Sequence, residues 1–255
     1  MVSGGGTFTY DGSGHPLTAT VTGAGGLSAS VPVVGCVASP TDVADSCTGT
    51  ATYAGDANHT GSGASAAVTI TKAPTTTSVT FGAGPFPYTG SAYTATASVS
   101  PVAAGSATVA YTGDCTNGGS TCTATATFAG SANYLPSVSA PASITITYTI
   151  CGGAGGDTSP AKNSGSTIPV KVQVCASGGA NVGSTSLVVK AVGITPSASL
   201  ADSGKANPGN LFRFDDGQYI FNMSTKGFAA GAYTLDYTVG NDPTVYHYAF
   251  AIRAK

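Results

Sequence analysis

The sequence predicts an all-β protein made of small β-sandwiches, and three features of the chain support this prediction. Charged residues make up only 8% of the 255 residues, and glutamate, a good helix former, does not occur. Threonine, valine, isoleucine and tyrosine, which fit pleated strands, alternate with small residues in runs such as 18–22 (TATVT) and 121–128 (TCTATATF). Glycine, proline, asparagine and aspartate separate these runs, which is typical of many short strands joined by turns.

Two copies of one module follow each other in the first part of the chain. Residues 47–59 (CTGTATYAGDANH) return 75 residues later as residues 122–134 (CTATATFAGSANY). Downstream of this motif, residues 67–71 (AVTIT) match 143–147 (SITIT), and upstream of it residues 8–12 (FTYDG) match 86–90 (FPYTG). The sequence therefore predicts repeat 1 at residues 1–73 and repeat 2 at residues 74–148, with Lys72-Ala-Pro74 as the seam between them.

The start of repeat 1 differs from the start of repeat 2. Residues 75–81 (TTTSVTF) precede the Phe-Pro-Tyr motif of repeat 2, whereas repeat 1 begins at Met1-Val2 and has no room for that strand. We therefore expect the first domain to lack its opening strand. Either the sequence starts inside the domain, or another chain fills the open edge by strand addition.

A third module with its own pattern occupies residues 149–255. Residues 212–214 (FRF) and 219–221 (YIF) flank Asp216-Gly217, which predicts a tight β-hairpin. Large side chains alternate along residues 233–239 and 246–252, so we expect this module to have the best-packed core of the chain.

The repeated segment resembles the bacterial immunoglobulin-like repeats of large secreted and surface proteins. Residues 53–59 (YAGDANH) and 67–81 (AVTITKAPTTTSVTF) carry the resemblance, which covers about residues 2 to 148. Residues 160–172 (PAKNSGSTIPVKV), 212–227 and 231–235 are similar to an immunoglobulin-like domain that closes such proteins and has no assigned catalysis. The resemblance implies tandem immunoglobulin-like β-sandwich domains in an elongated array.

Six cysteines form one sequential pair in each predicted module. The expected disulfides are Cys36 with Cys47, Cys115 with Cys122, and Cys151 with Cys175. The repeat alignment matches Cys47 to Cys122, so their upstream partners should correspond as well, but other connectivities stay open. Zinc is the competing interpretation, although no Cys-x-x-Cys spacing occurs. Disulfides place the chain outside the cell or on its surface, and we expect any signal peptide to lie outside this sequence.

Composition argues against several classes of partner. The formal net charge of −2, without a cluster of lysines or arginines, argues against nucleic acid. No apolar run approaches the roughly 20 residues that span a bilayer, so we expect no membrane insertion.

Nothing in the sequence marks a catalytic or metal site, and we expect a protein that is not an enzyme and holds no cofactor. His15, His59 and His247 each have a packing or turn explanation, and no Gly-x-Ser-x-Gly elbow occurs. Loop aspartates such as Asp42, Asp45 and Asp56 lack a calcium-loop pattern and are typical of turns. Asp215-Asp216 lies at the predicted hairpin. A Lys171–Asn222 isopeptide bond is a weaker hypothesis based on strand position.

Three functions fit these observations. The first is a structural stalk or spacer in a surface or secreted protein. The second is an adhesive module for a glycan or a protein, whose binding platform would be exposed rings at Tyr219, Tyr237, Tyr246 and Tyr248. The third is a subunit of an extracellular filament, in which the chain self-associates because the incomplete first domain accepts a strand from the next molecule.

Overall fold

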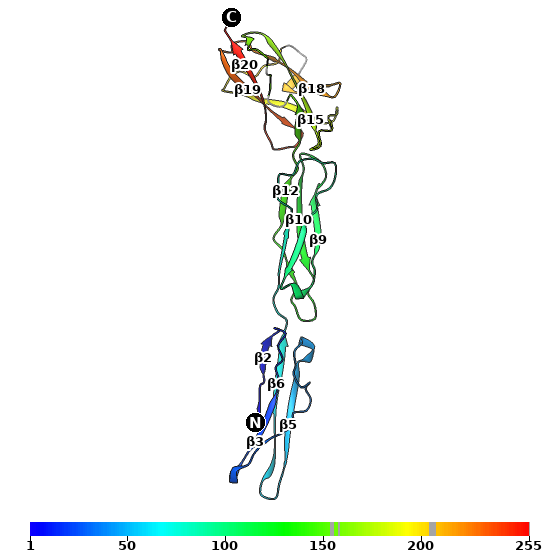
Figure 1. Ribbon diagram of the computed structural model, residues 1–255, viewed down its shortest axis with the longest axis vertical. Helices are drawn as coiled ribbons and strands as arrows, with labels where there is room; N and C mark the ends of the chain where they lie inside the picture. The colour runs from blue at the N-terminus through cyan, green and yellow to red at the C-terminus, as the bar shows by residue number, and fades with distance from the viewer. Residues whose placement is uncertain (154–155, 158, 204–207, 255) are drawn as a thin grey trace. The chain divides into compact units, whose positions relative to one another are not determined.

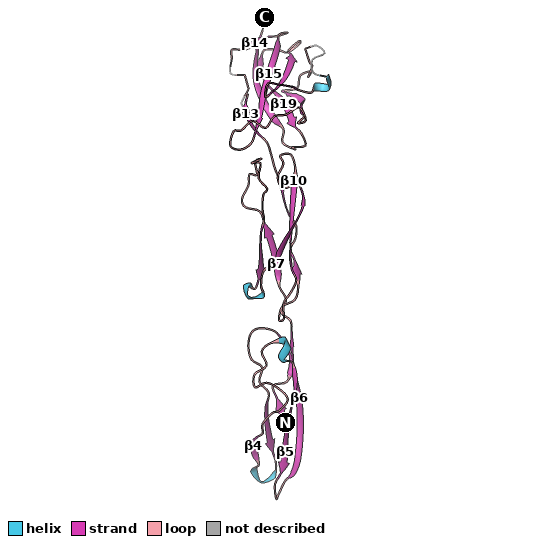
Figure 2. Ribbon diagram, turned by 90° about the vertical axis from the view of Figure 1, so that its right-hand side faces the viewer, coloured by secondary structure: helices cyan, strands magenta, loops and turns pink. Residues whose placement is uncertain are grey.

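The computed structural model describes residues 1–153, 156–157, 159–203 and 208–254. Within these ranges the regular structure is β-strand and short 3₁₀ turns, with no α-helix, which confirms the predicted all-β class (Figure 2). The chain forms two compact units. The first contains residues 1–80, 96–110 and 125–141, and the second contains residues 81–95, 111–124 and 142–255.

The first unit contains three small sheets and begins with repeat 1. Repeat 1 contributes the sheets β1-β3-β4 and β2-β6-β5, and β7 pairs with β8 at the start of repeat 2 (Figure 1). The strands are β1 (Val2–Ser3), β2 (Gly6–Thr9), β3 (Thr18–Thr22), β4 (Ser28–Ser30), β5 (Cys47–Gly55), β6 (Thr60–Thr71), β7 (Thr76–Thr80), β8 (Thr96–Ser100) and β11 (Ser137–Val138). Strands β9 (Thr108–Gly113) and β10 (Thr121–Phe128) begin or end in this unit.

Repeat 1 does have a short opening strand, where the sequence analysis expected none. Val2 and Ser3 pair antiparallel with Ala19 and Thr18 of β3. The same register occurs in repeat 2, where Val79 pairs with Ala97 of β8. Strand β1 is therefore the two-residue counterpart of the end of β7, which has five residues.

The core of repeat 1 is thin because its strands alternate threonine with small side chains. Along β5 the threonines at positions 48, 50 and 52 face solvent while Ala51 is buried. Val68 and Ile70 of β6 supply the larger buried groups, and Ala19 of β3 is a small buried one. Such a core buries little apolar area, so cross-links matter for its stability.

The second unit contains the C-terminal module, which is a sandwich of two four-stranded sheets. One sheet has the order β13-β15-β18-β17 and the other has the order β14-β20-β19-β16 (Figure 1). The strands of the unit are β12 (Ala142–Thr145), β13 (Thr149–Gly152), β14 (Lys162–Asn163), β15 (Thr167–Cys175), β16 (Val189–Thr195), β17 (Arg213–Asp215), β18 (Gln218–Ser224), β19 (Gly231–Val239) and β20 (Tyr246–Arg253). Read along the chain as A, A′, B, C, D, E, F and G, these sheets are ABED and A′GFC, the immunoglobulin strand order.

The C-terminal module has the large apolar core that its alternating pattern predicts. Val170, Val172 and Val174 of β15 face Leu235, Tyr237 and Val239 of β19 across the sandwich, and all six side chains are buried. The predicted hairpin is also confirmed, because β17 and β18 are joined by Asp216 and Gly217. Both residues have positive φ, 45° and 73°, as a type I′ turn requires.

Each predicted module contains a parallel pairing between an early segment and its last strand. Phe8 of β2 lies opposite Ile70 of β6, Pro87 lies opposite Thr147, and Lys162 of β14 lies opposite Ile252 of β20. Parallel neighbours cannot be joined by a tight hairpin. Each of these pairings therefore joins a segment near the start of a module's sequence to a segment near its end.

Candidate functional site at the seams

A first seam lies within the first unit, where the end of repeat 1 meets a loop of repeat 2. Asn133 comes after β10 in the chain, and its side chain contacts a 3₁₀ turn at Val43–Asp45. Its Nδ2 donates to Asp42 Oδ1 at 2.6 Å, and its Oδ1 accepts the Val43 N–H at 3.0 Å. One amide side chain therefore satisfies both a carboxylate and a backbone donor across the seam.

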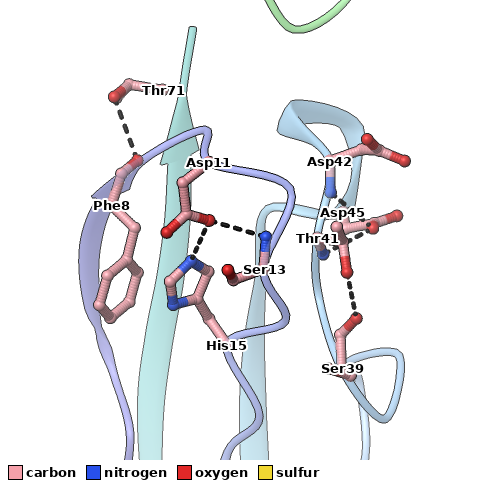
Figure 3. Close-up of polar contacts among 9 residues, drawn as sticks. All are labelled: Phe8, Asp11, Ser13, His15, Ser39, Thr41, Asp42, Asp45 and Thr71. Carbon is pink, nitrogen blue, oxygen red and sulfur yellow. Dashed lines mark hydrogen bonds and ion pairs between the residues drawn. The ribbon is translucent and has the colours of Figure 1, made fainter. Parts of the chain in front are cut away.

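The turn that receives Asn133 is held in shape by Asp45 (Figure 3). Asp45 Oδ2 accepts the backbone N–H groups of Asp42 and Thr41, each at 3.0 Å. These two donors hold the pKa of the Asp45 carboxyl below its ordinary value, because they favour the ionised form. Asp42 and Asp45, two of the aspartates considered above as calcium ligands, therefore act here as turn and seam residues.

The connector between the repeats lies along the same loop. Lys72 Nζ donates to the Ser131 carbonyl oxygen at 2.7 Å. Ala73 donates its N–H to the Asn133 carbonyl and accepts the Leu135 N–H, at 2.9 and 2.8 Å. The ring of Tyr134 meets that of Tyr10 edge to face, with centroids 5.3 Å apart. Lys72 and Ala73, two of the three residues at the predicted seam, thus contact the loop that follows β10.

A second seam lies within the second unit, around the buried carboxylate of Asp242. Its Oδ2 accepts the Tyr148 N–H at 2.7 Å, and its Oδ1 accepts the Thr244 N–H at 2.9 Å. The Tyr246 hydroxyl lies 2.6 Å from Asp242 Oδ2 and 2.8 Å from the Tyr148 carbonyl oxygen. Burial, and next the hydrogen bond to Asp242, raise the pKa of the Tyr246 hydroxyl.

Gly119, in the loop before β10, lies against the backbone of Asn241 and Asp242. Its N–H donates to the Ile146 carbonyl at 2.6 Å, and its φ of 76° lies in the left-handed region. A Cβ at this position would lie 2.8 Å from the Asp242 nitrogen, so only glycine allows the approach.

The six cysteines form three disulfides, one in each predicted module. The pairs are Cys36–Cys47, Cys115–Cys122 and Cys151–Cys175, with Cα atoms 5.5, 4.6 and 5.9 Å apart. Three disulfides indicate folding in an oxidising compartment. Cys122 and Cys175 are fully buried, so two of the links are anchored in the modules' interiors.

The proposed platform of exposed tyrosines does not exist. Tyr219 and Tyr237 are each 1% exposed, Tyr248 is buried, and Tyr246 is half-buried at the second seam. The side chains alternate as predicted, but the aromatic face of these strands faces the core of the sandwich. Aromatic rings of this size contribute most when they are buried, and the Tyr219 hydroxyl still donates to the Ser184 carbonyl at 2.9 Å.

The three histidines have local partners. His15 stacks on Phe8 with ring centroids 3.9 Å apart, and its Nε2 lies 3.7 Å from Asp11 (Figure 3). His247 Nδ1 lies 2.7 Å from Asp236 Oδ1 on the outer face of the C-terminal module. His59 Nδ1 lies 2.8 Å from Asp56 Oδ1.

Metal ligands and the proposed cross-link give no further site. In the described part of the chain, no group of three histidine, cysteine, aspartate or glutamate side chains is arranged to hold a metal ion. Lys171 lies opposite Ile220 and Asn222 lies opposite Pro169, so the two residues occupy diagonal positions on one face of the β15–β18 pair. The isopeptide bond stays a prediction.

One seam residue could have been found from the sequence and two could not. Asn133 is part of the repeated motif, where Asn58 is its counterpart, so its recurrence was a usable signal. Asp242 and Tyr148 lie 94 residues apart and carry no pattern that links them.

No helix among the described residues is both long and apolar enough to cross a membrane.

Strand order, disulfides and seams define a disulfide-linked, immunoglobulin-like β-sandwich protein. No protein-family model matches the chain, and no curated protein matches it. Among solved structures, the chain is similar to a three-domain immunoglobulin fragment of titin carrying an E-to-A mutation, with 11% identity, TM-score 0.32, and coverage of 100% of this chain and 98% of that one.

Two further structures are similar at the same low level. The S-layer protein rSbsC has 11% identity and TM-score 0.26, with coverage of 92% of this chain and 37% of that one. The immunoglobulin domains 1–4 of Sidekick-1 have 10% identity and TM-score 0.20, with coverage of 100% and 76%. The strand order of the C-terminal module by itself defines the immunoglobulin-like class.

Proposed function

We propose that this chain is a non-catalytic structural spacer of an extracellular or cell-surface protein. The observation that carries the proposal is the construction of the two seams. At each seam a polar side chain from one module satisfies backbone groups of the other, as Asn133 does for Val43 and Asp242 does for Tyr148. Directional hydrogen bonds restrict how neighbouring modules rotate, which suits a part whose role is to hold other parts at a set distance.

The location of the polar groups supports a role without catalysis. His59 and His247 each contact a nearby aspartate, and Asp42, Asp45 and Asp242 accept hydrogen bonds from backbone or amide donors at the seams. A catalytic site needs a nucleophile or a base aimed at an open pocket. The carboxylates described here are used to hold the fold together.

The disulfides support an extracellular or surface location. Small domains with little apolar core gain much of their stability from such links, and the links persist in oxidising compartments. The adhesive alternative loses its motivating feature, because the tyrosines that were its platform are buried or half-buried.

Small-angle X-ray scattering on the purified chain tests the spacer proposal. We expect a narrow distribution of particle dimensions for the wild type and a broader one for Asn133→Ala combined with Lys72→Ala, which removes the Asn133 and Lys72 side-chain hydrogen bonds of the first seam. Asn58→Ala is the matched control, because this exposed asparagine is the repeat 1 counterpart of Asn133. An equally broad distribution for the wild type and the double variant would contradict a spacer with fixed joints.

A further inference from the structure

The loop between β5 and β6 carries a motif that neither seam uses. Residues 56–60 read Asp-Ala-Asn-His-Thr, so a threonine lies two positions after Asn58 and an aspartate lies two positions before it. Asparagine followed two positions later by serine or threonine, with no proline between them, is the acceptor motif for N-linked glycans. Bacterial enzymes that attach such glycans also need an acidic residue two positions before the asparagine, and Asp56 provides it. The longer and more specific form of the motif is therefore complete at Asn58.

The fold presents this asparagine to solvent. The loop joins β5 to β6 beyond the pair Gly55 and Thr60 (Figure 1). It forms a tight turn, in which the Asp56 N–H donates to the His59 carbonyl oxygen at 3.0 Å and Asp56 Oδ1 accepts the Asn58 N–H at 2.8 Å. Asn58 and Thr60 are exposed, and neither side chain has a hydrogen-bond partner among the described residues. The amide that would react is therefore free of other contacts.

The matching loop of repeat 2 has lost the motif. Residues 131–135 read Ser-Ala-Asn-Tyr-Leu, so the asparagine recurs as Asn133 but the aspartate and the threonine do not. The Asn133 side chain is also occupied, because it donates to Asp42 and accepts the Val43 N–H. The motif is thus not a by-product of the repeat. It occurs where the amide is free and is missing where the amide holds a seam.

A second short motif in the chain serves as an internal comparison. Asn222 is followed two positions later by Ser224, but no acidic residue lies two positions before it. Asn222 is half-buried within β18, opposite Pro169 of β15, and its carbonyl oxygen accepts the Ser203 N–H at 2.8 Å. A strand with chain on both sides does not offer its amide to an enzyme, so we expect Asn222 to stay unmodified.

A hollow beside Asn58 has room for a sugar ring. Its volume is about 400 Å³, and the residues that line it include Leu27, Tyr53 and Thr60. Tyr53 is half-buried, and its hydroxyl donates to Asp56 Oδ2 at 2.7 Å. An aromatic ring and an aliphatic side chain suit the apolar face of a sugar. The first sugar of a glycan on Asn58 would therefore find a surface to pack against.

The disulfides agree with the compartment in which such a transfer takes place. Cys36–Cys47 lies in the same repeat as Asn58. Disulfides persist in the secretory compartments of cells and in the bacterial periplasm. The enzymes that attach N-linked glycans act on chains that have reached these same compartments.

We propose that Asn58 is an acceptor site for an N-linked glycan. The donor is an oligosaccharide joined through pyrophosphate to a membrane lipid. The side-chain nitrogen of Asn58 forms a bond to the anomeric carbon of the first sugar, and the bond from that carbon to the pyrophosphate oxygen breaks. The lipid pyrophosphate leaves with the electron pair, and the amide loses one proton to a base of the transferring enzyme. The glycan covers the end of the β5–β6 hairpin, where a bulky solubilising group faces solvent.

Glycopeptide mass spectrometry on the protein isolated from the cells that secrete it tests the proposal. We expect a glycan on the peptide that contains Asn58, released by an amidase that converts the asparagine to aspartate, and none on the peptide that contains Asn222. An unmodified Asn58 in that protein would overturn the proposal. A sugar attached to Thr60 instead of Asn58 would do the same, because the linkage would then be to oxygen.

Transfer in vitro to the purified, folded chain identifies the residues that direct the reaction. A bacterial N-oligosaccharyltransferase and a lipid-pyrophosphate-linked oligosaccharide are added, and occupancy at Asn58 is read by mass spectrometry. We expect the wild type to accept the glycan and Thr60→Val and Asp56→Asn to lose it. Thr48→Val is the matched control, because Thr48 is an exposed threonine of β5 outside the motif, and it should accept the glycan as the wild type does. Equal occupancy in all four chains would contradict recognition of this motif.

A transplanted motif separates the effect of sequence from that of exposure. Ser131→Asp combined with Leu135→Thr completes the motif around Asn133, whose amide is held by Asp42 and Val43. We expect Asn133 in this variant to accept the glycan after unfolding but not in the folded chain, while Asn58 accepts it in both. Equal transfer to Asn133 and Asn58 in the folded variant would refute the part that we assign to the free amide of Asn58.

Discussion

Asp242 is the residue on which the second seam depends most. Its carboxylate is 3% exposed and contacts two backbone N–H groups and one tyrosine hydroxyl. A buried carboxylate is stable only when such donors surround it, and each donor loses its partner if the carboxylate is removed.

We expect Asp242→Ala to destabilise the C-terminal module by about 2–4 kcal/mol, because buried donors are left without an acceptor. Denaturant unfolding followed by tyrosine fluorescence measures the change. Asp215→Ala is the control, since this exposed residue ends β17 beside the hairpin turn and should change stability by less than about 0.5 kcal/mol. Similar losses in both variants would show that Asp242 has no special role.

His59 makes the tip of repeat 1 sensitive to pH. Its Nε2 lies 3.0 Å from the Ala24 carbonyl oxygen, and its Nδ1 lies 2.8 Å from Asp56 Oδ1. Two acceptors favour the ring with both nitrogens protonated, and the hydrogen bond to Ala24, followed by that to Asp56, raises the pKa of His59 above its ordinary 6.5.

Because the pKa of His59 is raised in the folded state, the direction of the pH effect on its contacts is set. The contact between His59 and the loop at Ala24 is fully formed below pH 6.5, and it weakens as the pH rises through the higher folded-state pKa. We expect amide exchange at residues 24–26, corrected for its intrinsic pH dependence, to accelerate across that interval. His59→Gln should remove the dependence. An NMR titration that places the His59 pKa at or below 6.5 would contradict this account.

At the residue scale, the sequence shows which residues recur between the repeats better than it shows what each side chain contacts. The recurrence of Cys47 as Cys122 and of Asn58 as Asn133 is visible in one alignment of the chain with itself. The pattern of alternate tyrosines shows which rings share a face but not whether that face meets solvent or the opposite sheet. The rings of Tyr219 and Tyr237 face the opposite sheet, because that sheet provides enough apolar surface to cover them.

Among the elements, the loop that carries Gly119 has little room for a larger side chain. We expect Gly119→Ala to destabilise the second unit by about 1–3 kcal/mol, because the substitution combines a left-handed φ with a contact to the Asp242 backbone. Gly178→Ala is the control, since a Cβ there meets nothing within 4 Å. Thermal unfolding of the two variants measures the difference, and equal transition temperatures would refute it.

The three disulfides should differ in their contribution because their loops differ in length. Cys151–Cys175 closes 24 residues and Cys115–Cys122 closes seven. In the chain-entropy model these loops correspond to about 3.4 and 2.4 kcal/mol. Replacing each pair by alanines and measuring unfolding tests this order. A larger loss for the shorter loop would indicate that native packing, and not loop entropy, sets the contribution.

The strands were predictable where side chains alternate over five or more residues. The expected runs 18–22 and 121–128 are the observed bounds of β3 and β10, and the hairpin at Asp216-Gly217 lies where it was predicted. Short strands such as β1 and β14 have two residues each and carry no periodic signal. Their pairing depends on distant strands, so no local pattern reveals it.

At the scale of the whole molecule, apolar burial is distributed unevenly. The C-terminal module buries rings and branched side chains on both sheets, whereas a core cluster in repeat 2 consists of Val99, Ala104 and Phe128 with two partly buried neighbours. The number of buried apolar groups sets much of a domain's stability. The modules should therefore not unfold together.

We expect calorimetry to show two or more transitions, with the C-terminal module unfolding last. Exchange measured by mass spectrometry should assign the slowest amides to β15, β18 and β19, which contribute most of the large, fully buried side chains among the described residues. A single transition with uniform exchange along the chain would show instead that the seams couple all modules into one cooperative unit.

The parallel pairing of β2 with β6, and of β14 with β20, has a mechanical consequence. When the two ends of a module are pulled in opposite directions, parallel neighbours slide along each other, and their hydrogen bonds are loaded together rather than opened one after another. Four residue pairs share the force in repeat 1, from Gly6 opposite Val68 to Thr9 opposite Thr71. This geometry predicts that repeat 1 resists stretching more strongly than a module whose end strands separate one hydrogen bond at a time.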